Sequence, residues 1–458
     1  MLSEYKMLSI KNYSLNLNKP QKQIIGLLCV GTFLEYFDLM LYIHMALFLN
    51  EIFFPTNNYY TAILLSAFAF CSSYIFRPFG AIIFGFIGDK IGRKSTIVIS
   101  TFIMATSCLI MANLPTYNQI GITASVVVTL CRAIQGMSSI AEFVGAQIYL
   151  TEILKPPIRY VGVMLMPISM MLGTIVALYM ASKVISNNLN WRYLFWFGGI
   201  VAFVGLFART KLTETAEFIQ AKGNTLAKQI AATDTKISTP SKIKFTTIIA
   251  LFFMHSAWPV CSYFCYIYSG NILKNNFAFT SAQILHENLI ISIANLFTLL
   301  LVAYYSYRVY PLKLAKLLLI PFVITTIIGS WLLTQSYTAS NLFIVRLLIL
   351  LFVPYSGLIT AISFNHVPIL KRFTYISLAL AVSHSVFYCI APFVVAYLIE
   401  IFNFFGIIII NLPLAICFLW SIIHFENLEK LMLSNNNSRT AELLYDYNKQ
   451  GLSANLNN

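Results

Sequence analysis

A short charged segment interrupts a long apolar region in the first quarter of the chain. Residues 85–94 read GFIGDKIGRK and carry four charges, at Asp89, Lys90, Arg93 and Lys94. Apolar runs flank this segment on both sides, so it is too short to hold a domain. Such a spacer predicts a tight turn between two membrane-spanning helices. Its basic charge predicts that the turn lies on the cytoplasmic side.

The composition supports a membrane-embedded chain. Of the 458 residues, 59% are hydrophobic and only 10% are charged, whereas soluble domains carry about 25% charged residues. A membrane environment explains the deficit, because a charge at the centre of a bilayer costs at least about 2–3 kcal/mol. We therefore predict an all-α membrane protein and exclude the soluble globular class.

Twelve apolar segments are long enough to cross a bilayer as helices, which needs about 20 residues each. They are expected at 24–49, 61–84, 95–113, 119–147, 161–183, 192–209, 245–270, 286–306, 314–334, 340–362, 374–399 and 404–424. The first six and the last six are separated by a polar segment with several lysines. This spacing predicts two six-helix bundles joined by a linker.

The predicted organisation has five parts. A cytoplasmic N-terminus at 1–23 is polar and basic and predicts no cleavable signal peptide. It precedes an N-terminal bundle at 24–209, a cytoplasmic linker at 210–244 and a C-terminal bundle at 245–424. The asparagine-rich tail at 425–458 lacks sustained heptads, so no coiled coil is expected, and its last residues are expected to be disordered.

The distribution of basic residues predicts the orientation. On this topology, 24 of the 30 lysines and arginines fall in the two termini and the loops of one side. The opposite loops hold three, Lys183, Arg192 and Lys274. This asymmetry predicts that both termini are cytoplasmic. It also accounts for the net charge of +14, because such residues set topology and meet anionic lipid, and no nucleic-acid partner is needed.

Two carboxylates lie in the middle of the first predicted span. Glu35 and Asp38 share one helix face at i and i+3, and Tyr42 continues that face. Acids inside a membrane span are costly unless they face a polar cavity or partners. They are therefore candidates for binding substrate, an ion or a proton, and burial would favour the protonated form. The alternative is a structural ion pair with an arginine on a neighbouring helix.

The fourth predicted span is the most polar one. Arg132, Gln135, Ser139 and Glu142 form one stripe at i, i+3, i+7 and i+10. We expect this stripe to face a water-accessible cavity. A structural polar seam would explain Gln135 and Ser139 but not a mid-span arginine. Arg132 is expected to pair with Glu35 or Asp38, or to bind a substrate carboxylate, because its fork geometry suits either.

The other polar residues within spans carry weaker signals. Arg77 precedes a proline near the predicted cytoplasmic end of the second span, and we expect it to snorkel toward the interface. In the second half, His255, Arg346, Asn365 and His384 are notable, although lone histidines seldom act as ligands. The eight cysteines show no metal-ligand or disulfide spacing. We predict no metal site and no cofactor.

Several motifs together resemble one transporter family. The loop at 85–94, the preceding RPFG at 77–80, the EYFD at 35–38 and the fourth-span stripe at 132–142 are similar to the metabolite:proton symporters of the major facilitator superfamily. The WRYLFWF segment at 191–197 and the LTET at 212–215 also look like that family, which includes proline/betaine, α-ketoglutarate, citrate and shikimate transporters. The resemblance covers most of the first half.

The resemblance implies a fold and a gating role. Family members have twelve helices in two six-helix bundles around a central site, and they work by alternating access, usually with proton entry. Asp89 and Arg93 match positions that latch the two bundles together, within a gating loop formed by Gly85, Asp89, Gly92, Arg93 and Lys94. The loop after the eighth span, residues 304–313, lacks this pattern. The osmosensing members' coiled-coil tail is also missing, which argues against an osmosensor.

The functional hypothesis is a proton-driven importer of a proline/betaine-like osmolyte or small organic acid. Its expected substrate and proton site is Glu35, Asp38, Tyr42, Arg132, Gln135 and Glu142, with a proton gradient in place of any cofactor. We expect a monomer in a bacterial inner membrane, with a small-molecule substrate, protons and lipid as partners. The alternatives are a transport-inactive sensor or scaffold, and an uncoupled exchanger or drug exporter. An enzyme is not expected, because the sequence has no nucleophile–base pair and no phosphate-cradling loop.

Overall fold

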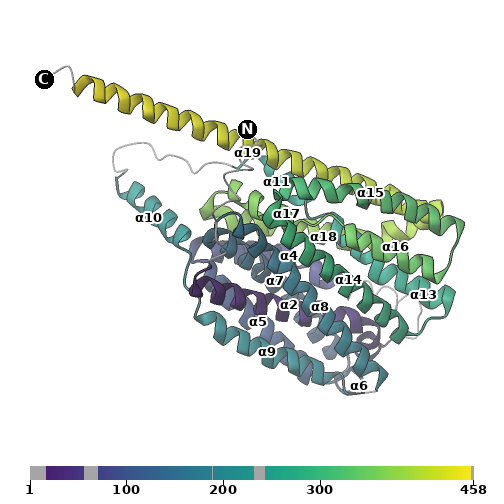
Figure 1. Ribbon diagram of the computed structural model, residues 1–458. Coiled ribbons are helices and arrows are strands. Elements are labelled where there is room, and N and C mark those ends of the chain that lie inside the picture. Colours follow the sequence, from purple (N-terminus) through teal and green to yellow (C-terminus); the bar gives the residue numbers. More distant parts are fainter. Residues whose placement is uncertain (1–16, 56–70, 188, 232–242, 455–458) are drawn as a thin grey trace.

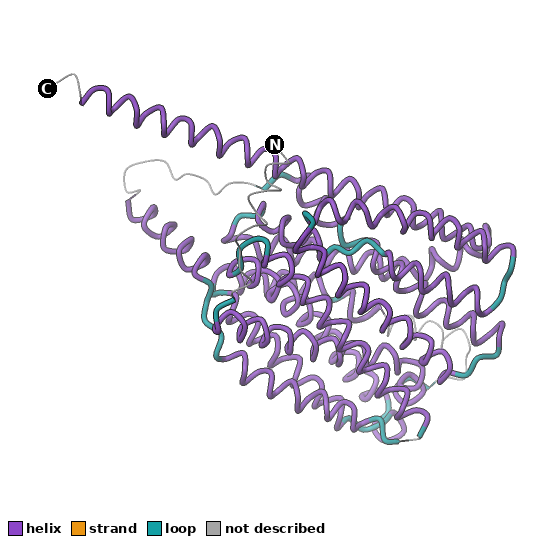
Figure 2. The backbone as a smooth tube through the Cα atoms, in the orientation of Figure 1, coloured by secondary structure: helices purple, strands orange, loops and turns teal. Residues whose placement is uncertain are grey.

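The protein is a bundle of long helices (Figures 1 and 2). The computed structural model describes residues 17–55, 71–187, 189–231 and 243–454. Within these ranges the chain forms helices and short connections, and no strand is present. The predicted all-α class is therefore confirmed.

The first half contains the six membrane helices of the N-terminal bundle and one short connecting helix. They are α2 (Lys19–Phe53), α4 (Arg77–Lys90), α5 (Arg93–Asn113), the short α6 (Tyr117–Ile120), α7 (Ile122–Ile153), α8 (Ile158–Ser186) and α9 (Arg192–Thr210). A turn at Phe76 separates α4 from a helical segment that begins at Cys71. The start of the predicted second span, at 61–70, lies outside the described residues.

The second half contains more interrupted helices. They are α11 (Phe245–Phe253), α12 (Ala257–Ser262), the π-helix η1 (Tyr263–Tyr268), α13 (Ser269–Phe277), α14 (Ser281–Arg308), α15 (Pro311–Gln335), α16 (Ala339–Phe352), α17 (Gly357–Ser363), α18 (Arg372–Phe402) and α19 (Gly406–Ala454). Short 3₁₀ turns lie at Phe364–His366, Ile369–Lys371 and Asn403–Phe405.

The described residues supply twelve membrane spans. Ten helical stretches are long and apolar enough to cross a bilayer. One of them, Ile369–Met432, joins α18 and α19, which are two successive helices. The apolar part of α9, Arg192–Phe207, is shorter and adds the remaining span. The chain is thus a multi-pass membrane protein.

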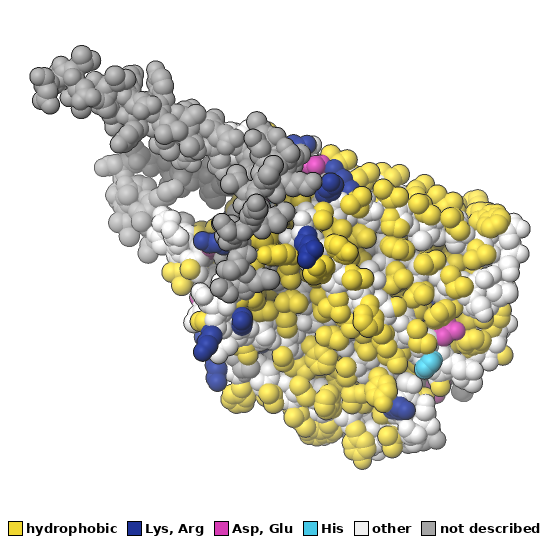
Figure 3. Space-filling model, viewed as in Figure 1, with side chains coloured by type: hydrophobic (Ala, Val, Ile, Leu, Met, Phe, Trp, Pro, Cys, Tyr) yellow, Lys and Arg dark blue, Asp and Glu magenta, His cyan; other side chains and the backbone are white. Residues whose placement is uncertain are grey.

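Apolar side chains cover the middle of the visible face, where yellow dominates Figure 3. Among the described residues, the exposed apolar side chains include Ile82, Phe86, Phe207, Trp331 and Phe393, each of which is at least half exposed. In water such a surface would be an aggregation hazard. In a bilayer it faces hydrocarbon, while the helices satisfy their own backbone hydrogen bonds.

The helices form two six-helix bundles that pack side by side (Figure 1). The purple to teal helices α2–α9 lie together, and the green and yellow helices α11–α19 lie beside them, with α14 alongside α8. One apolar core spans the boundary, since Ile140 and Met164 of the first half belong to the same buried cluster as Leu299 and Phe373 of the second.

Interruptions in the seventh and tenth spans coincide with prolines. Pro354 lies between α16 and α17, and Pro259 lies in the short α12 that precedes the π-helix. Proline lacks the N–H that an uninterrupted helix needs, and membrane helices tolerate such breaks where neighbouring groups satisfy the freed backbone. Both breaks lie at the central cavity described below, which Pro354, Trp258 and Tyr263 line.

Two segments outside the spans are more ordered than their composition indicates. Within the predicted linker, Ala216–Ala231 forms α10, which packs at one end of the bundles (Figure 1). The last span does not stop near 424, because α19 continues to Ala454. Disorder is expected only for the last residues of the tail, and 455–458 lie outside the described residues. No proline follows Pro413 inside α19 to end the helix.

Candidate functional site

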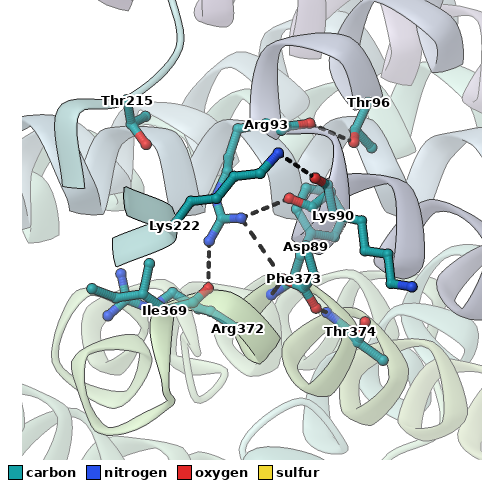
Figure 4. A network of polar contacts seen from close by, with 12 residues as sticks. Asp89, Lys90, Arg93, Thr96, Thr215, Lys222, Ile369, Arg372, Phe373 and Thr374 are labelled. Carbon is teal, nitrogen blue, oxygen red and sulfur yellow. Dashed lines mark hydrogen bonds and ion pairs between the residues drawn. The ribbon is translucent and has the colours of Figure 1, made fainter. Parts of the chain in front are cut away.

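The loop that joins α4 to α5 docks onto the second half. Asp89 accepts hydrogen bonds from the backbone N–H groups of Phe373 (3.0 Å) and Thr374 (2.9 Å). Both lie in the first turn of α18, so the Asp89 carboxylate caps a helix of the opposite bundle (Figure 4). A helix N-terminus carries partial positive charge and unpaired N–H groups, which a carboxylate satisfies. Gly85 permits this close approach, because a Cβ there would lie 2.8 Å from the Cα of Thr374.

Arg93 ties the same loop to two other segments, α7 and the turn that precedes α18. Its guanidinium donates to the carbonyls of Gly88 (2.6 Å) and Ile369 (2.7 Å) and to Oε1 of Glu152 (3.1 Å). A weaker ion pair to Asp89 spans 3.7 Å. Figure 4 shows Arg93 reaching from α5 toward the segment that precedes α18. Arg93 is fully buried, so each of these contacts is shielded from water.

Glu152 and Arg372 extend this cluster to α10. Arg372 of α18 lies 3.1 Å from Oε1 of Glu152 on α7 and 3.6 Å from Oε2 of Glu217 on α10. Thr215 donates to the other oxygen of Glu152 at 2.6 Å. Partial burial raises the pKa of Glu217, and the charge of Arg372 opposes that shift. We call Asp89, Arg93, Glu152 and Arg372 the latch cluster.

Gly92 and Glu214 shape the beginning of α5. Gly92 has φ +147° and ψ 165°, a conformation that is essentially restricted to glycine. The Glu214 carboxylate accepts from the backbone N–H groups of Arg93 (3.1 Å) and Lys94 (3.2 Å). Lys94 thus contributes its backbone to the loop.

A second polar group lies inside the first bundle. Asp38 on α2 accepts a hydrogen bond from Nε2 of Gln135 at 2.9 Å, and Oε1 of Gln135 accepts from Arg132 at 3.1 Å. The guanidinium of Arg132 lies over the ring of Tyr42, 4.2 Å from its centre. Arg132 is therefore joined to Asp38 through Gln135 and not by a direct ion pair, which was one of the two roles expected for it.

Glu142 has a partner that the sequence did not indicate. It forms an ion pair with Arg209 near the end of α9, and both residues contact Thr101 on α5, which donates to Glu142 at 2.9 Å. Arg209 is fully buried and packs against Gly31 of α2, where a larger residue would collide with its guanidinium. The count of basic residues by side placed Arg209 with the loop cations, because it lies at the end of the sixth predicted span. The ion pair with Glu142 of α7 became evident only from the packing of α9 beside α7.

Glu35 is the acid without a partner. It is 2% exposed, and no described residue donates a hydrogen bond to either carboxylate oxygen. With Asp38 and Glu142 it lines a small internal cavity between α2, α5, α7 and α9. We call Glu35, Asp38, Arg132, Gln135, Glu142 and Arg209 the inner cluster. Its acids face this small internal cavity, whereas we had expected the fourth-span stripe to face a water-accessible one.

A larger cavity lies between the two bundles. It encloses about 1250 Å³ of atom-free space, part of it continuous with the solvent. Its lining comes from both halves and includes Tyr36, Tyr74, Arg77, Phe143, Gln147, His255, Trp258, Tyr266, His384 and Tyr388. A cavity of this size between bundles is a typical ligand site.

Arg77 lies in this central cavity, so the expectation that it snorkels to the interface is wrong. It is 3% exposed, and its Nη1 lies 2.8 Å from Nδ1 of His384 on α18. The reason is local. Pro78 cannot donate to the carbonyl of Tyr74, and Ser385 of α18 donates to that carbonyl instead, at 2.5 Å. This draws α18 against the helix and brings His384 to Arg77.

The remaining polar candidates of the second half differ in location. His255 lies in the central cavity, where the centre of its ring lies 6.1 Å from the centre of the His384 ring. Arg346 is buried and pairs with Glu287 at 2.7 Å. Asn365 accepts from Arg159 at 3.1 Å.

The loop after the eighth span has contacts of a different kind. Tyr310 donates to Glu429 at 3.3 Å, and its ring contacts that of Tyr160 on α8. His366 also approaches Glu429, at 2.8 Å. The first loop contacts the opposite bundle through Asp89, which caps a helix there. This second loop contacts the opposite bundle through the aromatic ring of Tyr310 instead.

Comparison with known proteins gives relatives of one kind. The chain is 26% identical over 388 residues to a citrate-proton symporter of Salmonella typhi, covering 81% of the chain and 86% of the relative. It is 27% identical to a citrate-proton symporter of Klebsiella pneumoniae over 59% of the chain and 61% of the relative. It is 30% identical to a putative proline/betaine transporter of Staphylococcus aureus, over 44% of the chain and 45% of the relative.

The fold has known counterparts. A structure of the proton:xylose symporter XylE superposes with a TM-score of 0.73 at 15% identity, covering 89% of this chain and 95% of the other. The family model described as Major Facilitator Superfamily matches residues 28–369. The predicted resemblance and the predicted twelve-helix fold are both confirmed, and the chain belongs to the Major Facilitator Superfamily.

Proposed function

We propose that this secondary transporter takes up a small metabolite together with protons by alternating access. The substrate would bind in the central cavity, and the inner cluster would carry the proton. Proline/betaine-like osmolytes and small organic acids are the candidate classes, and the citrate-proton symporters and the putative proline/betaine transporter among the relatives support them.

The observation that carries proton coupling is the state of Glu35. Its carboxyl group is buried beside Asp38 and without a hydrogen-bond donor, while the charges of Arg77 and Arg209 act on it. A buried carboxylate without a donor favours proton uptake, and a nearby arginine favours proton release. A group balanced in this way suits reversible protonation.

The latch cluster would hold the bundles together at one end. Asp89 and Arg93 reach across from the first half, and their partners Phe373, Thr374 and Ile369 belong to the second. Opening that end must break these contacts, and closing it must restore them. Gly85 would allow the close approach to α18. Gly92 would supply the backbone conformation of the loop, and Lys94 would donate its backbone N–H to Glu214.

The proposed setting is a bacterial inner membrane with both termini in the cytoplasm. The relatives reported above come from bacteria. The excess of lysine and arginine on one side of the predicted topology supports the orientation, which would place the latch cluster at the cytoplasmic end.

Uptake into proteoliposomes under an imposed pH gradient tests the function. Labelled proline, glycine betaine and small organic acids would be offered to the purified full-length chain. We expect at least one to accumulate when the outside is acidic. No uptake of any of them by folded protein would contradict the proposal and favour a sensor or scaffold. Counterflow that moves no protons would indicate an uncoupled exchanger.

A further inference from the structure

The central cavity contains one permanently charged side chain among its described lining residues. Arg77 of α4 contributes it, and the remaining ionisable lining groups are tyrosines and the histidines His44, His255 and His384. An arginine stays protonated in proteins, so in the contact between Arg77 and His384 the guanidinium donates and Nδ1 of the imidazole accepts. Nε of Arg77 has no partner among the described residues.

Three further polar atoms of the same cavity lack hydrogen-bond partners among the described residues. They are Oε1 of Gln147 on α7, Nε2 of His255 and Nε2 of His44 on α2. The side chains of Gln147 and His255 are more than nine-tenths buried. An unpaired buried polar group destabilises a fold by about 1–3 kcal/mol. Four such groups around one cavity indicate a site that a polar ligand completes.

The aromatic and apolar lining of the cavity indicates which kind of ligand it would bind. Tyr74 and Tyr388 stack with their ring centres 3.8 Å apart, and Arg77 lies over the ring of Tyr74 at 4.6 Å. Phe143 and Trp258 add further aromatic surface. One cation set among aromatic and apolar walls suits a molecule with one carboxylate and an apolar body. A tricarboxylate would bring two more negative charges that no described lining residue neutralises.

The charges inside the first bundle balance one another. The inner cluster contributes three carboxylates, Glu35, Asp38 and Glu142, and two guanidinium groups, while Arg77 adds a third cation. With every group ionised, this set is neutral. A bound monoanion gives it one negative charge too many, and one proton restores neutrality. Glu35 is the acid whose oxygens are both unpaired, so it is the group best placed to take that proton.

We propose that Arg77, held by His384, binds the carboxylate of a monoanionic metabolite with an apolar body, and that Glu35 takes up one proton with each anion, so that transport is electroneutral. This proposal rests on the proposed function. It adds the substrate class, the anchoring residue and the stoichiometry. It also assigns roles to Arg77 and His384, which lie outside the inner cluster.

The coupling follows from the cost of buried charge. The empty bundle and the bundle with both anion and proton are neutral, and both can change conformation. Binding of the anion alone or of the proton alone leaves one uncompensated charge, and enclosing that charge away from water during the conformational change costs several kcal/mol. The protein therefore does not change conformation with only one of the two bound, and anion and proton move together.

The groups that surround Glu35 and Arg77 come from six helices or their extensions. They are Tyr36 and Asp38 on α2, Tyr74 before α4, Cys108 on α5, Arg132 and Glu142 on α7, Arg209 on α9, and His384 and Tyr388 on α18. Arg209 already pairs with Glu142, and Arg132 is joined to Asp38. The pair left over is Glu35 and Arg77.

Binding to the purified full-length protein tests the anchor. The probes are phenyllactate, citrate and glycine betaine, followed by tryptophan fluorescence and by thermal shift. We expect phenyllactate to bind most tightly. Arg77→Gln should weaken that binding roughly 10- to 100-fold, because a charged hydrogen bond is lost, whereas Arg77→Lys should weaken it less. Arg192→Gln is the matched control, since Arg192 donates to the carbonyl of Leu114 outside the cavity.

Two binding results would overturn the anchor. One is tighter binding of citrate or betaine than of phenyllactate. The other is phenyllactate binding that is absent in folded protein or unaltered in Arg77→Gln. Size-exclusion chromatography and the melting profile of each variant establish that it is folded.

Transport under a clamped membrane potential tests the stoichiometry. Uptake of phenyllactate driven by a pH gradient is compared with and without a valinomycin potential of 100 mV, and protein-free liposomes correct for passive entry. We expect the same accumulation in both. Movement of one net charge would change accumulation about 50-fold per 100 mV, and that result would overturn electroneutral coupling. Uptake of no compound at all would instead contradict the proposed function.

Discussion

The partners of single charged residues decide which of them belong to a site. The helical spacing in the sequence predicted that Glu35, Asp38 and Gln135 lie on inward faces, and each is buried. It could not predict Arg209 or Arg77, because both lie near helix ends, where arginine commonly snorkels. Which arginine meets which acid depends on the packing of separate helices, and a local pattern does not contain that information.

Replacing only one partner of the ion pair between Glu142 and Arg209 should destabilise the fold strongly, whereas replacing both partners should destabilise it little. Arg209→Met leaves a buried carboxylate without its cation, and we expect a loss of about 3–5 kcal/mol in folding free energy. The double variant Arg209→Met with Glu142→Gln should recover most of that loss. A double-mutant cycle of thermal stability in detergent measures both. Equal losses in the single and double variants would contradict the pairing.

Gly92 should tolerate no side chain. Its φ of +147° costs a non-glycine residue about 1–3 kcal/mol, and a Cβ would meet the Glu214 carboxylate. We expect Gly92→Ala to lower the melting temperature. Gly223→Ala is the matched control, because nothing lies within 4 Å of its added Cβ and alanine favours the helix α10. Similar melting temperatures for the two variants would show that the loop is not strained in this way.

At the scale of helices, the apolar runs predicted the spans well and their interruptions poorly. The run at 95–113 lies within α5, whose bounds are Arg93–Asn113. The seventh span, by contrast, contains one break, at 254–256, and a π-helix at Tyr263–Tyr268. Hydropathy registers length and polarity, whereas a break depends on whether neighbouring helices satisfy the freed backbone groups. The sequence did not predict the helix α10, because its polar composition is typical of a linker.

The contact between Asp89 and α18 should favour the state that is closed at the latch end. Asp89→Asn removes the charge that faces the helix N-terminus, an interaction that contributes about 0.3–2 kcal/mol. We expect a larger population open at that end, measured as faster labelling of a cysteine placed at Ile369. Transport should be altered as well. Lys94→Gln is the control, because the described contacts of Lys94 use its backbone N–H. Labelling and flux unchanged in Asp89→Asn would contradict the latch.

At the scale of the whole molecule, three features lie in a connected arrangement. The latch cluster joins the bundles at one end, the central cavity lies between them, and the inner cluster lies behind the cavity in the first bundle. Arg77 connects the last two, because it lines the cavity while its charge acts on Glu35. The sequence predicted the two-bundle architecture and the loop, since both are recorded in contiguous segments. The central cavity combines α4 with α18, about 300 residues apart, and was beyond local patterns.

The most direct test of proton coupling compares accumulation with exchange in Glu35→Gln. In proteoliposomes, the unaltered protein should accumulate substrate against its gradient when the outside is acidic, and it should also exchange substrate at equal pH. Glutamine keeps the size of Glu35 but takes up no proton, so the variant should still exchange substrate and should fail to accumulate it. Accumulation by Glu35→Gln equal to that of the unaltered protein would contradict the assignment of Glu35 as the proton carrier.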